Sequence, residues 1–465
     1  MNATDSCHLI WLRNDLRVHD QPALFAAAQK QVPLEFVYVL DERLIGPTAW
    51  GFNRSGRRRL SWMMANVQEL HRQLASFGHT LYVALGHPVD LITKRLAAGG
   101  VSQVFLNDEP GFEEQKDADQ LRSFAAARGI PCSLFSGGDL FDFSQVSHLL
   151  DHQGQGFTPF RQKLERTGFV PHEPLQLPDL SRCSSSYTES IHGRDGFLVD
   201  CKQWQAQMGF KPEQKVPAHG DRGLVFELYQ DLPVDSRCDF TPQPGERGGL
   251  ERLHDYFFVG RSLQTYKETR NGMLGSTFST RFSPWLAVGS LSARSIWAES
   301  LRFEATYGRN EGSEWLRFEL LWREYFRHLS RLWGRRLFMP EGTATTYFPM
   351  TERASAPFEQ WCMGKTGHLF IDAHMNELSS TGWMSNRGRQ VVASYLVHHL
   401  HGDWRAGAAW FESRLIDFDV FSNQGNWAYI AGRGTDPRGG RRFDPDKQAR
   451  EHDPDGRYRQ IWSHP

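Results

Sequence analysis

The feature that most constrains the fold is a change in hydrophobic periodicity partway along the chain. Up to about residue 135, short apolar runs such as HLIWLRN and LEFVYVL alternate with segments of helical period, one of which ends at Gly78. Alternating strands and helices predict a parallel, doubly wound sheet, that is, a Rossmann-like α/β domain. Its first strand-to-helix turn, RNDLRVHD, lacks the pattern G-x-G-x-x-G, so the sheet alone indicates no dinucleotide.

The rest of the chain has a different pattern, with helical periodicity only. Segments such as SEWLRFELLWREYFRHLSRLW and NRGRQVVASYLVHHL repeat apolar residues every three or four positions. Residues 136–200 are rich in Ser, Pro, His and Gly, which is typical of a connection between domains. We therefore predict an α/β domain over residues 1–135, a linker over 136–200 and an all-α domain over 201–465.

Composition narrows the class of protein. The net charge of −1 gives no overall attraction to DNA, although residues 257–465 carry a surplus of about five positive charges. Six cysteines without CxxC spacing, no signal peptide and no membrane span predict a cytoplasmic protein with reduced thiols. The histidines of HHLH lack a carboxylate or thiol complement, so we expect capping or solvated side chains and no metal site.

Arginines form a stripe along the predicted helix WLRFELLWREYFRHLSRLW. They recur every four residues: Arg323, Arg327, Arg331 and Arg335. One interpretation is a solvated face paired with nearby glutamates of the same helix. The other is a surface that contacts phosphate groups.

Hydroxyl side chains surround Arg281 in the segment STFSTRFSP, just before a helix that begins with Pro284. Hydroxyls, backbone N–H groups and one guanidinium at a helix N-terminus suit a pyrophosphate. Serines at helix starts also serve as simple caps, so the sequence leaves both interpretations open.

The segments SNRGRQ and DFDVFSNQGNWAY combine charged, amide and aromatic residues. Arg389 and Asp417 could form a buried structural ion pair, or they could fix a polar heteroaromatic ring beside the amide of Asn423. Trp404 and Trp427 lie on either side of this run. Oxidisable rings placed between a buried cofactor and the surface would form an electron relay.

These segments together resemble the photolyase/cryptochrome family over nearly the whole chain. The similarity rests on long ordered blocks, including WLRNDLRVHDQPAL, YKETRNGMLGSTFSTRFSPWLAVGSLSAR, LSSTGWMSNRGRQVVASYLV and DWRAGAAWFESRLIDFDVFSNQGNWAY. The blocks NGMLGS, SNRGRQ and GRGTDPRGGRRF resemble the cryptochrome-DASH branch in particular.

The resemblance implies two cofactors. FAD would be held by Tyr266, Ser279, Thr280, Arg281, Phe282, Ser283, Asn386, Arg389, Asp417, Asp419 and Asn423. In this family the residue at the Asn423 position faces flavin N5, where a neutral amide stabilises the reduced ring. A 5,10-methenyltetrahydrofolate antenna would lie between the domains, with Glu114 on its pterin ring.

The resemblance also implies an electron relay and a DNA site. Trp427 would be the proximal electron donor and Trp404 the next. The family's outermost Trp falls on Thr351, so the relay would leave through Trp361, Tyr347 or another aromatic residue. The residues expected to contact a flipped pyrimidine dimer and its phosphate are Arg270, Glu319, Trp322, Arg323, Arg387 and Tyr429.

The last of these residues bears on substrate choice. Family members that act on duplex DNA carry Trp where this chain has Tyr429. The smaller ring offers less stacking surface to offset the cost of extruding a lesion from a duplex. The resemblance therefore predicts light-driven repair of cyclobutane pyrimidine dimers, preferentially in single-stranded DNA, by a monomer in which Glu319 and Asn423 assist the chemistry. The alternatives are a blue-light photoreceptor and a DNA-binding regulator without light chemistry.

Overall fold

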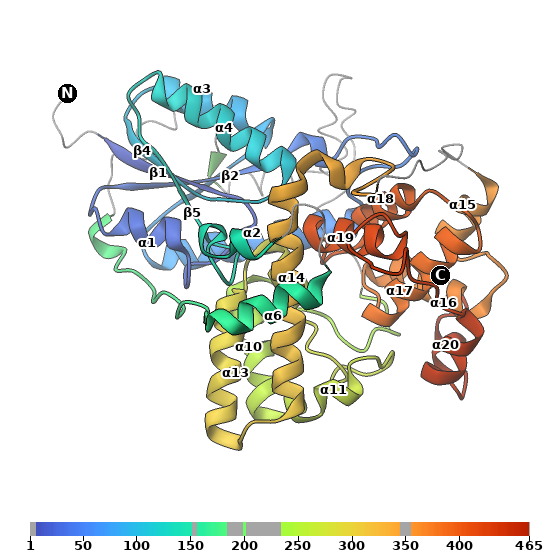
Figure 1. Cartoon of the computed structure of the whole chain (residues 1–465). Helices are drawn as coiled ribbons and strands as arrows, with labels where there is room; N and C mark the ends of the chain where they lie inside the picture. The colour runs from blue at the N-terminus through green and yellow to red at the C-terminus, as the bar shows by residue number, and fades with distance from the viewer. Residues whose placement is uncertain (1–5, 151–155, 184–198, 201–233, 345–354, 465) are drawn as a thin grey trace.

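The computed structural model describes residues 6–150, 156–183, 199–200, 234–344 and 355–464. Figure 1 shows an α/β domain beside a larger group of helices, with the long helix α14 (Glu311–Trp333) between them. This arrangement confirms the predicted fold class. Tyr347, a predicted relay residue, lies outside the described ranges, as does Thr351, the position of the family's outermost Trp.

The sheet of the first domain has the strand order β5-β4-β1-β2-β3-β6. All neighbouring strands are parallel except β6, which pairs antiparallel with β3. The central strand β1 is buried along its whole length, because helices cover both faces of the sheet. The strands are β1 (Cys7–Leu12), β2 (Leu34–Asp41), β3 (Leu81–Gly86), β4 (Val101–Asn107), β5 (Cys132–Phe135) and β6 (Val199–Asp200).

Alternate residues of the strands pack against helices on opposite faces. Leu9 belongs to the core shared with α3 and α4, whereas Ile10 belongs to the core shared with α1 and α2. Since α4 follows β4, its first turn lies at the carboxyl ends of the strands, where α/β domains bind ligands. The helices are α1 (Pro22–Ala28), α2 (Arg57–Ser76), α3 (Pro88–Ala97) and α4 (Phe112–Ala126).

The segment predicted as a linker contains short helices in its described part, α5 (Phe143–Val146) and α6 (Phe157–Thr167). Helix α6 packs on α14 through Phe157, whose ring stacks on Trp322 with centroids 3.9 Å apart. This contact ties the segment to the helical part of the molecule.

Past β6, the described ranges contain helices and no strand. Helix α14 packs on α11, α13 and α19, and α17 packs on α16, α18 and α19. Across the described ranges, every helix is too short or too polar to cross a membrane. The helices are α10 (Gly245–His254), α11 (Tyr266–Thr269), α12 (Ser283–Val288), α13 (Ala293–Tyr307), α15 (Ala356–Cys362), α16 (Leu369–Thr381), α17 (Asn386–His398), α18 (Trp404–Arg414), α19 (Val420–Ile430), α20 (Pro445–His452) and α21 (Arg457–Ile461).

Candidate functional site

An ion pair joins the start of α17 to the loop before α19. The Nη2 group of Arg389 donates to Oδ2 of Asp417 over 2.7 Å, and its Nε donates to the carbonyl of Met384. The other carboxylate oxygen of Asp417, Oδ1, is buried and has no hydrogen-bond partner among the described residues. A buried acceptor left unsatisfied is costly, so the pair retains a position for a ligand donor.

Helix α19 orients the amide of Asn423 toward the same region. Asp419 caps this helix by accepting from the backbone N–H of Ser422 over 2.7 Å, which places Asn423 one turn later. The Nδ2 group of Asn423 donates to the carbonyl of Ala408 on α18 over 3.1 Å. Since Nδ2 is held by α18, Oδ1 is left as the acceptor for a ligand. The side-chain oxygen of the neighbouring Gln424 is also buried, and no residue of the described ranges hydrogen-bonds to it.

A second polar cluster joins α11 to α14. Arg270 donates to Oε1 of Glu319 over 2.7 Å, and the indole of Trp315 donates to the same oxygen over 3.0 Å. Burial raises the pKa of Glu319, and burial likewise raises the pKa of the neighbouring Tyr266. Because both bonds fall on Oε1, the second oxygen of Glu319 is available to another donor.

The hydroxyl-rich segment has its carbonyl groups turned away from the site. The guanidinium of Arg252 donates to the carbonyls of Ser276, Ser279 and Thr280. Arg281 follows with a left-handed φ of +52°, and its guanidinium lies 4.0 Å over the ring of Trp383. The Nε of Arg281 is buried and has no hydrogen-bond partner within the part of the chain that the structure describes.

Phe282 and Ser283 end this hydroxyl-rich segment. Phe282 is buried at the N-cap position of α12, and Ser283 is the first residue of that helix. The backbone N–H groups at the start of a helix are not used by the helix itself. Hydroxyls and free N–H groups therefore remain available to an anion. Asn386, at the start of α17, is exposed.

Two of the predicted DNA-contacting residues are in ring contact. Trp322 on α14 and Tyr429 on α19 meet edge to face, with centroids 5.8 Å apart and an interplanar angle of 81°. Phe157 stacks on one face of the Trp322 ring, and Phe326 lies tilted against the same ring with centroids 5.4 Å apart, yet Trp322 stays partly exposed. Arg441, which sequence reasoning missed as a site residue, donates to the Tyr429 hydroxyl and pairs with Asp436 at 3.0 Å. Its only signal was its position in GRGTDPRGGRRF.

Two further arginines predicted to contact DNA lie in different places. Arg387 donates to the side chain of Asn271 over 3.4 Å, and its pKa is lowered by burial and by the charge of Arg270. Arg323 instead donates to the carbonyl of Gly138 over 2.9 Å and lines the cleft between the domains. The structure therefore does not bring Arg323 together with the Trp322–Tyr429 pair.

The predicted electron donor Trp427 is 2% exposed and packs against two aromatic rings. Its centroid lies 5.1 Å from that of Phe411 and 6.2 Å from that of Trp361. Trp404 is also fully buried, and its indole donates to the carbonyl of Pro340 over 3.2 Å. Among the described aromatic contacts, Trp361 and not Trp404 touches Trp427.

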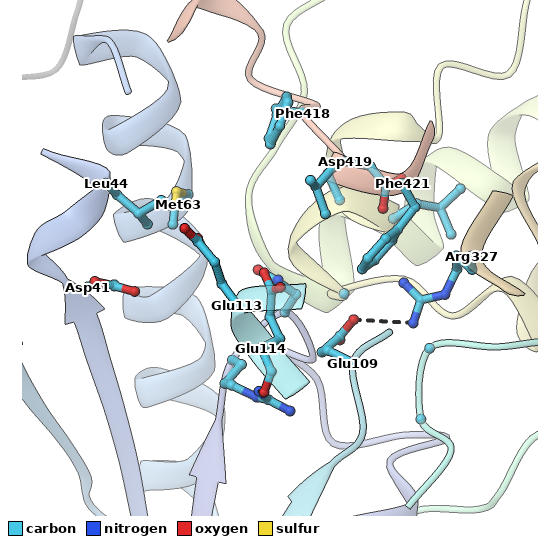
Figure 2. Close-up of a pocket in the computed structure, with 18 of the residues that line it drawn as sticks. Asp41, Leu44, Met63, Glu109, Glu113, Glu114, Arg327, Phe418, Asp419 and Phe421 are labelled. Carbon is cyan, nitrogen blue, oxygen red and sulfur yellow. Dashed lines mark hydrogen bonds and ion pairs between the residues drawn. The ribbon is translucent and has the colours of Figure 1, made fainter. Parts of the chain in front are cut away.

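The cleft between the domains contains the predicted antenna residue. Figure 2 shows Glu113 and Glu114, on the first turn of α4, in a pocket that Phe418, Asp419 and Phe421 of the helical domain also line. Burial raises the pKa of Glu114, and no described cation forms an ion pair with its carboxylate. Glu114 is therefore an acid of this cleft that remains available to a ligand donor.

Several other charges at the boundary between the domains are paired with one another. Arg327 contacts Glu109 at 3.2 Å and Asp139 at 2.5 Å. Burial alone would raise the pKa of Asp139, but the positive charge of Arg327 outweighs burial and lowers it. Arg331 binds Asp108 at 2.6 Å. The arginine stripe is thus neither a solvated face nor a phosphate surface along these positions. Arg327 and Arg331 hold acids of the first domain against α14, whereas Arg335 is exposed.

Comparisons with known proteins agree with this geometry. Residues 8–179 match the family described as DNA photolyase, and residues 315–463 match the FAD binding domain of DNA photolyase. The cryptochrome DASH of Gloeobacter violaceus is 38% identical, over 98% of this chain and 85% of that protein. The cryptochrome DASH of Xenopus laevis is 36% identical, over 97% of this chain and 81% of that protein.

Solved structures show the same architecture. The cryptochrome of Synechocystis sp. PCC6803 superposes with a TM-score of 0.87 at 36% identity, covering 99% of this chain and 89% of that one. A bacterial class III photolyase from Agrobacterium tumefaciens gives a TM-score of 0.76 at 25% identity, covering 98% of this chain and 86% of that one.

Proposed function

Because the chain belongs to the photolyase/cryptochrome family and to its cryptochrome DASH branch, we propose that it is a light-driven flavoprotein that repairs cyclobutane pyrimidine dimers, preferentially in single-stranded DNA. Reduced FAD, when bound, would supply the excited electron that splits the dimer. The protein's own contribution is to bind, orient and exclude water. We expect it to act as a cytoplasmic monomer.

The unsatisfied polar atoms of the helical domain support FAD as the ligand. Asp417 Oδ1 is an acceptor for a ring or ribityl donor, and the Oδ1 of Asn423 is an acceptor for the N–H that reduced flavin carries at N5. Arg281 and the hydroxyl-rich segment offer donors for the pyrophosphate. In this reading the Arg389–Asp417 ion pair is retained, and it orients the carboxylate.

The observation that carries the repair proposal is the contact between Trp322 and Tyr429. Trp322 is partly exposed, and we propose that a flipped base packs on this ring where Tyr429 meets it edge to face. Both rings stand on α14 and α19, which also carry Glu319 and Asn423, so a bound dimer would lie next to the flavin. Arg270, Arg387 and Arg441 add positive charge around this pocket, as contact with phosphates requires.

Single-stranded DNA is the favoured substrate because little unpairing is required to present its bases. We propose that the phenol of Tyr429, fixed by Arg441, gives too little stacking surface to offset extrusion from a duplex. We also propose that the cleft beside Glu114 binds 5,10-methenyltetrahydrofolate as an antenna. A buried carboxylate without a cation partner suits the N–H groups of a pterin ring.

The test is repair itself. Purified protein is chemically reduced and illuminated with matched single-stranded and duplex oligonucleotides that each carry one thymine dimer, and restored thymine absorbance is followed against dark samples. We expect repair of the single strand at a rate at least several-fold above the duplex. Equal rates would contradict the argument from Tyr429. No repair of either substrate would leave the photoreceptor alternative in place.

We propose Trp427 as the proximal electron donor during photoreduction of oxidised FAD, with Trp404 and Trp361 as candidates for the next step. A Trp427→Phe variant should lose photoreduction, because phenylalanine is far harder to oxidise, and should keep repair once reduced chemically. Transient absorption and steady-state flavin bleaching measure the first effect. Unchanged photoreduction would show that the donor lies elsewhere.

A further inference from the structure

Three buried side chains form a hydrogen-bonded chain in the helical domain outside the residues assigned above. The hydroxyl of Tyr458 lies 2.6 Å from Oε2 of Glu377 and 2.5 Å from Nδ1 of His374. All three residues are at most 5% exposed. Glu377 and His374 are neighbours on one face of α16, and Tyr458 reaches them from α21, more than 80 residues later in the chain.

This chain of atoms can carry its protons in two arrangements. In the first, His374 donates from Nδ1 to the Tyr458 oxygen, and the Tyr458 hydroxyl donates to an ionised Glu377. In the second, a protonated Glu377 donates to Tyr458, whose hydroxyl donates to Nδ1 of a neutral His374 with its proton on Nε2. Both arrangements satisfy the same two hydrogen bonds. They differ by one proton.

The two ends of the chain face different surroundings. At one end, Nε2 of His374 has no hydrogen-bond partner among the described residues. The half-buried His452 on α20 is close enough for its charge to lower the pKa of His374, to which burial contributes most. At the other end, the charges of Arg281 and Arg389 act on Glu377, and Arg389 is the partner of Asp417.

The remaining charges around Glu377 do not neutralise it. No described cation forms an ion pair with its carboxylate. Burial raises its pKa to about 7, Arg281 and Arg389 oppose the shift, and Asp239 reinforces it. Asp453, which pairs with Arg459 at 2.7 Å, acts on Tyr458 from the far side. Burial lowers the pKa of His374 to about 3, so this histidine is neutral at rest and transmits a proton rather than storing one.

We propose that Glu377 holds an exchangeable proton beside the flavin-binding pair Arg389–Asp417, and that Tyr458 and His374 connect this proton to the His452 side of the domain. The proposal rests on the proposed FAD site. Glu377 is a positioning residue, because it acts on the flavin through the charge it presents near Arg389. A buried site gains from taking up a proton when negative charge accumulates next to it.

The proton balance is simple. One proton enters at Nε2 of His374, the Nδ1 proton passes to the Tyr458 oxygen, and the Tyr458 proton passes to Glu377. His374 and Tyr458 end with the number of protons with which they began, and Glu377 gains one. The electrons that create the new negative charge come from an added reductant, here dithionite.

The experiment measures proton uptake directly. FAD-loaded protein in weak buffer near pH 7 is reduced with dithionite, and uptake is followed with a pH-indicator dye. Infrared difference spectra report the carbonyl stretch of a protonated carboxyl group. Flavin N5 takes up its own proton and dithionite oxidation releases protons in every sample, so the informative quantity is the difference between the wild type and each variant. We expect the wild type to take up as much as one proton more per flavin than Glu377→Gln and to show a new carboxyl band that this variant lacks. In Tyr458→Phe and His374→Asn, the uptake of this additional proton should be slower. Glu359→Gln, a change at an exposed acid on α15, is the matched control.

The outcomes separate two failures. A Glu377→Gln variant with the proton uptake and infrared band of the wild type would overturn the proton-holding role. Uptake of normal rate in both Tyr458→Phe and His374→Asn would overturn the path. If the wild-type protein binds no FAD, the proposed function fails instead. Should Glu377→Gln not fold, Glu377→Asp tests the same role, because a shortened carboxyl group should shift the infrared band without removing it.

Discussion

The cleft between the domains and the polar region of the helical domain both contain buried charged groups, yet these groups find their partners differently in the two regions. In the cleft, Arg327 binds both Glu109 and Asp139, and Arg43 binds both Asp41 and Asp117. In the helical domain, buried atoms of Asp417, Gln424, Arg281 and Arg387 have no hydrogen-bond partner among the described residues.

The difference indicates what each region is for. A cleft whose charges pair with one another holds the two domains together whether or not a ligand is present. A region with unsatisfied buried donors and acceptors is costly by itself and becomes favourable only with a ligand that supplies partners. By this criterion the helical domain is the stronger ligand site, and Glu114 is the exception within the cleft.

The largest effect should come from breaking the self-paired charges. Arg327→Met leaves Glu109 buried without its cation and leaves Asp139 with Arg331 alone, at 3.6 Å, and losing one partner of a buried ion pair typically costs about 3–5 kcal/mol. We expect a clear fall in the denaturation midpoint, whereas FAD affinity of the folded fraction stays near that of the wild type. Arg335→Met, at an exposed arginine just after the same helix, is the control. A large loss of FAD affinity with normal stability would mean that Arg327 serves ligand binding and does not hold the domains together.

Glu377 tests the cost of an unpaired acid in the helical domain. Its folded-state pKa of about 7 lies above the ordinary value of 4.5, so the folded state binds the proton more tightly than the unfolded state. Glu377 therefore contributes its full stabilisation to the folded state below pH 4.5. As the pH rises through 7, the free energy of unfolding loses this contribution, about 3 kcal/mol in total. Glu377→Gln should remove this loss.

The measurement is the denaturation midpoint of the wild type and Glu377→Gln at pH 5 and pH 8. Relative to the wild type, the variant should gain stability at the higher pH, and Glu359→Gln should show no such trend. If the denaturation midpoints of Glu377→Gln and the wild type differ by the same amount at pH 5 and at pH 8, then Glu377 is already ionised at pH 5.

Asp417→Asn should separate ligand binding from stability. The variant removes the charge that accepts from Arg389 and changes the unsatisfied oxygen, and a hydrogen bond to a charged group contributes about 1.5–3 kcal/mol. FAD affinity should therefore fall about tenfold to a hundredfold by fluorescence titration, with a smaller loss of apoprotein stability than in Arg327→Met. Asp446→Asn, at an exposed acid, is the control. Unchanged affinity would mean that Asp417 has a structural role alone.

The sequence predicted secondary structure better than it predicted contacts between residues that are far apart in the chain. Periodicity was sufficient for the fold class, and the Arg389–Asp417 pair was one of two stated interpretations. Both interpretations of the arginine stripe were wrong for Arg327, because its partners lie 188 and 218 residues away, in the predicted linker and in the first domain. Helical period identifies which residues share a face but not what packs against it. The contact of Tyr458 with Glu377 was missed for the same reason.

The smallest expected effect concerns Glu114, the acid of the cleft that has no ion pair with a described cation. Glu114→Gln replaces a carboxylate that no described cation pairs with, so stability should be unchanged or slightly raised. Replacing the charged acceptor should weaken binding of added 5,10-methenyltetrahydrofolate several-fold, corresponding to about 1 kcal/mol, measured by antenna absorbance after reconstitution. Glu113→Gln is the matched control, because Glu113 lies next in the sequence but pairs with Arg54 at 2.8 Å. Equal folate binding by Glu114→Gln and Glu113→Gln would place both acids with the structural charges of the cleft, and the distinction between the two regions would then have no exception.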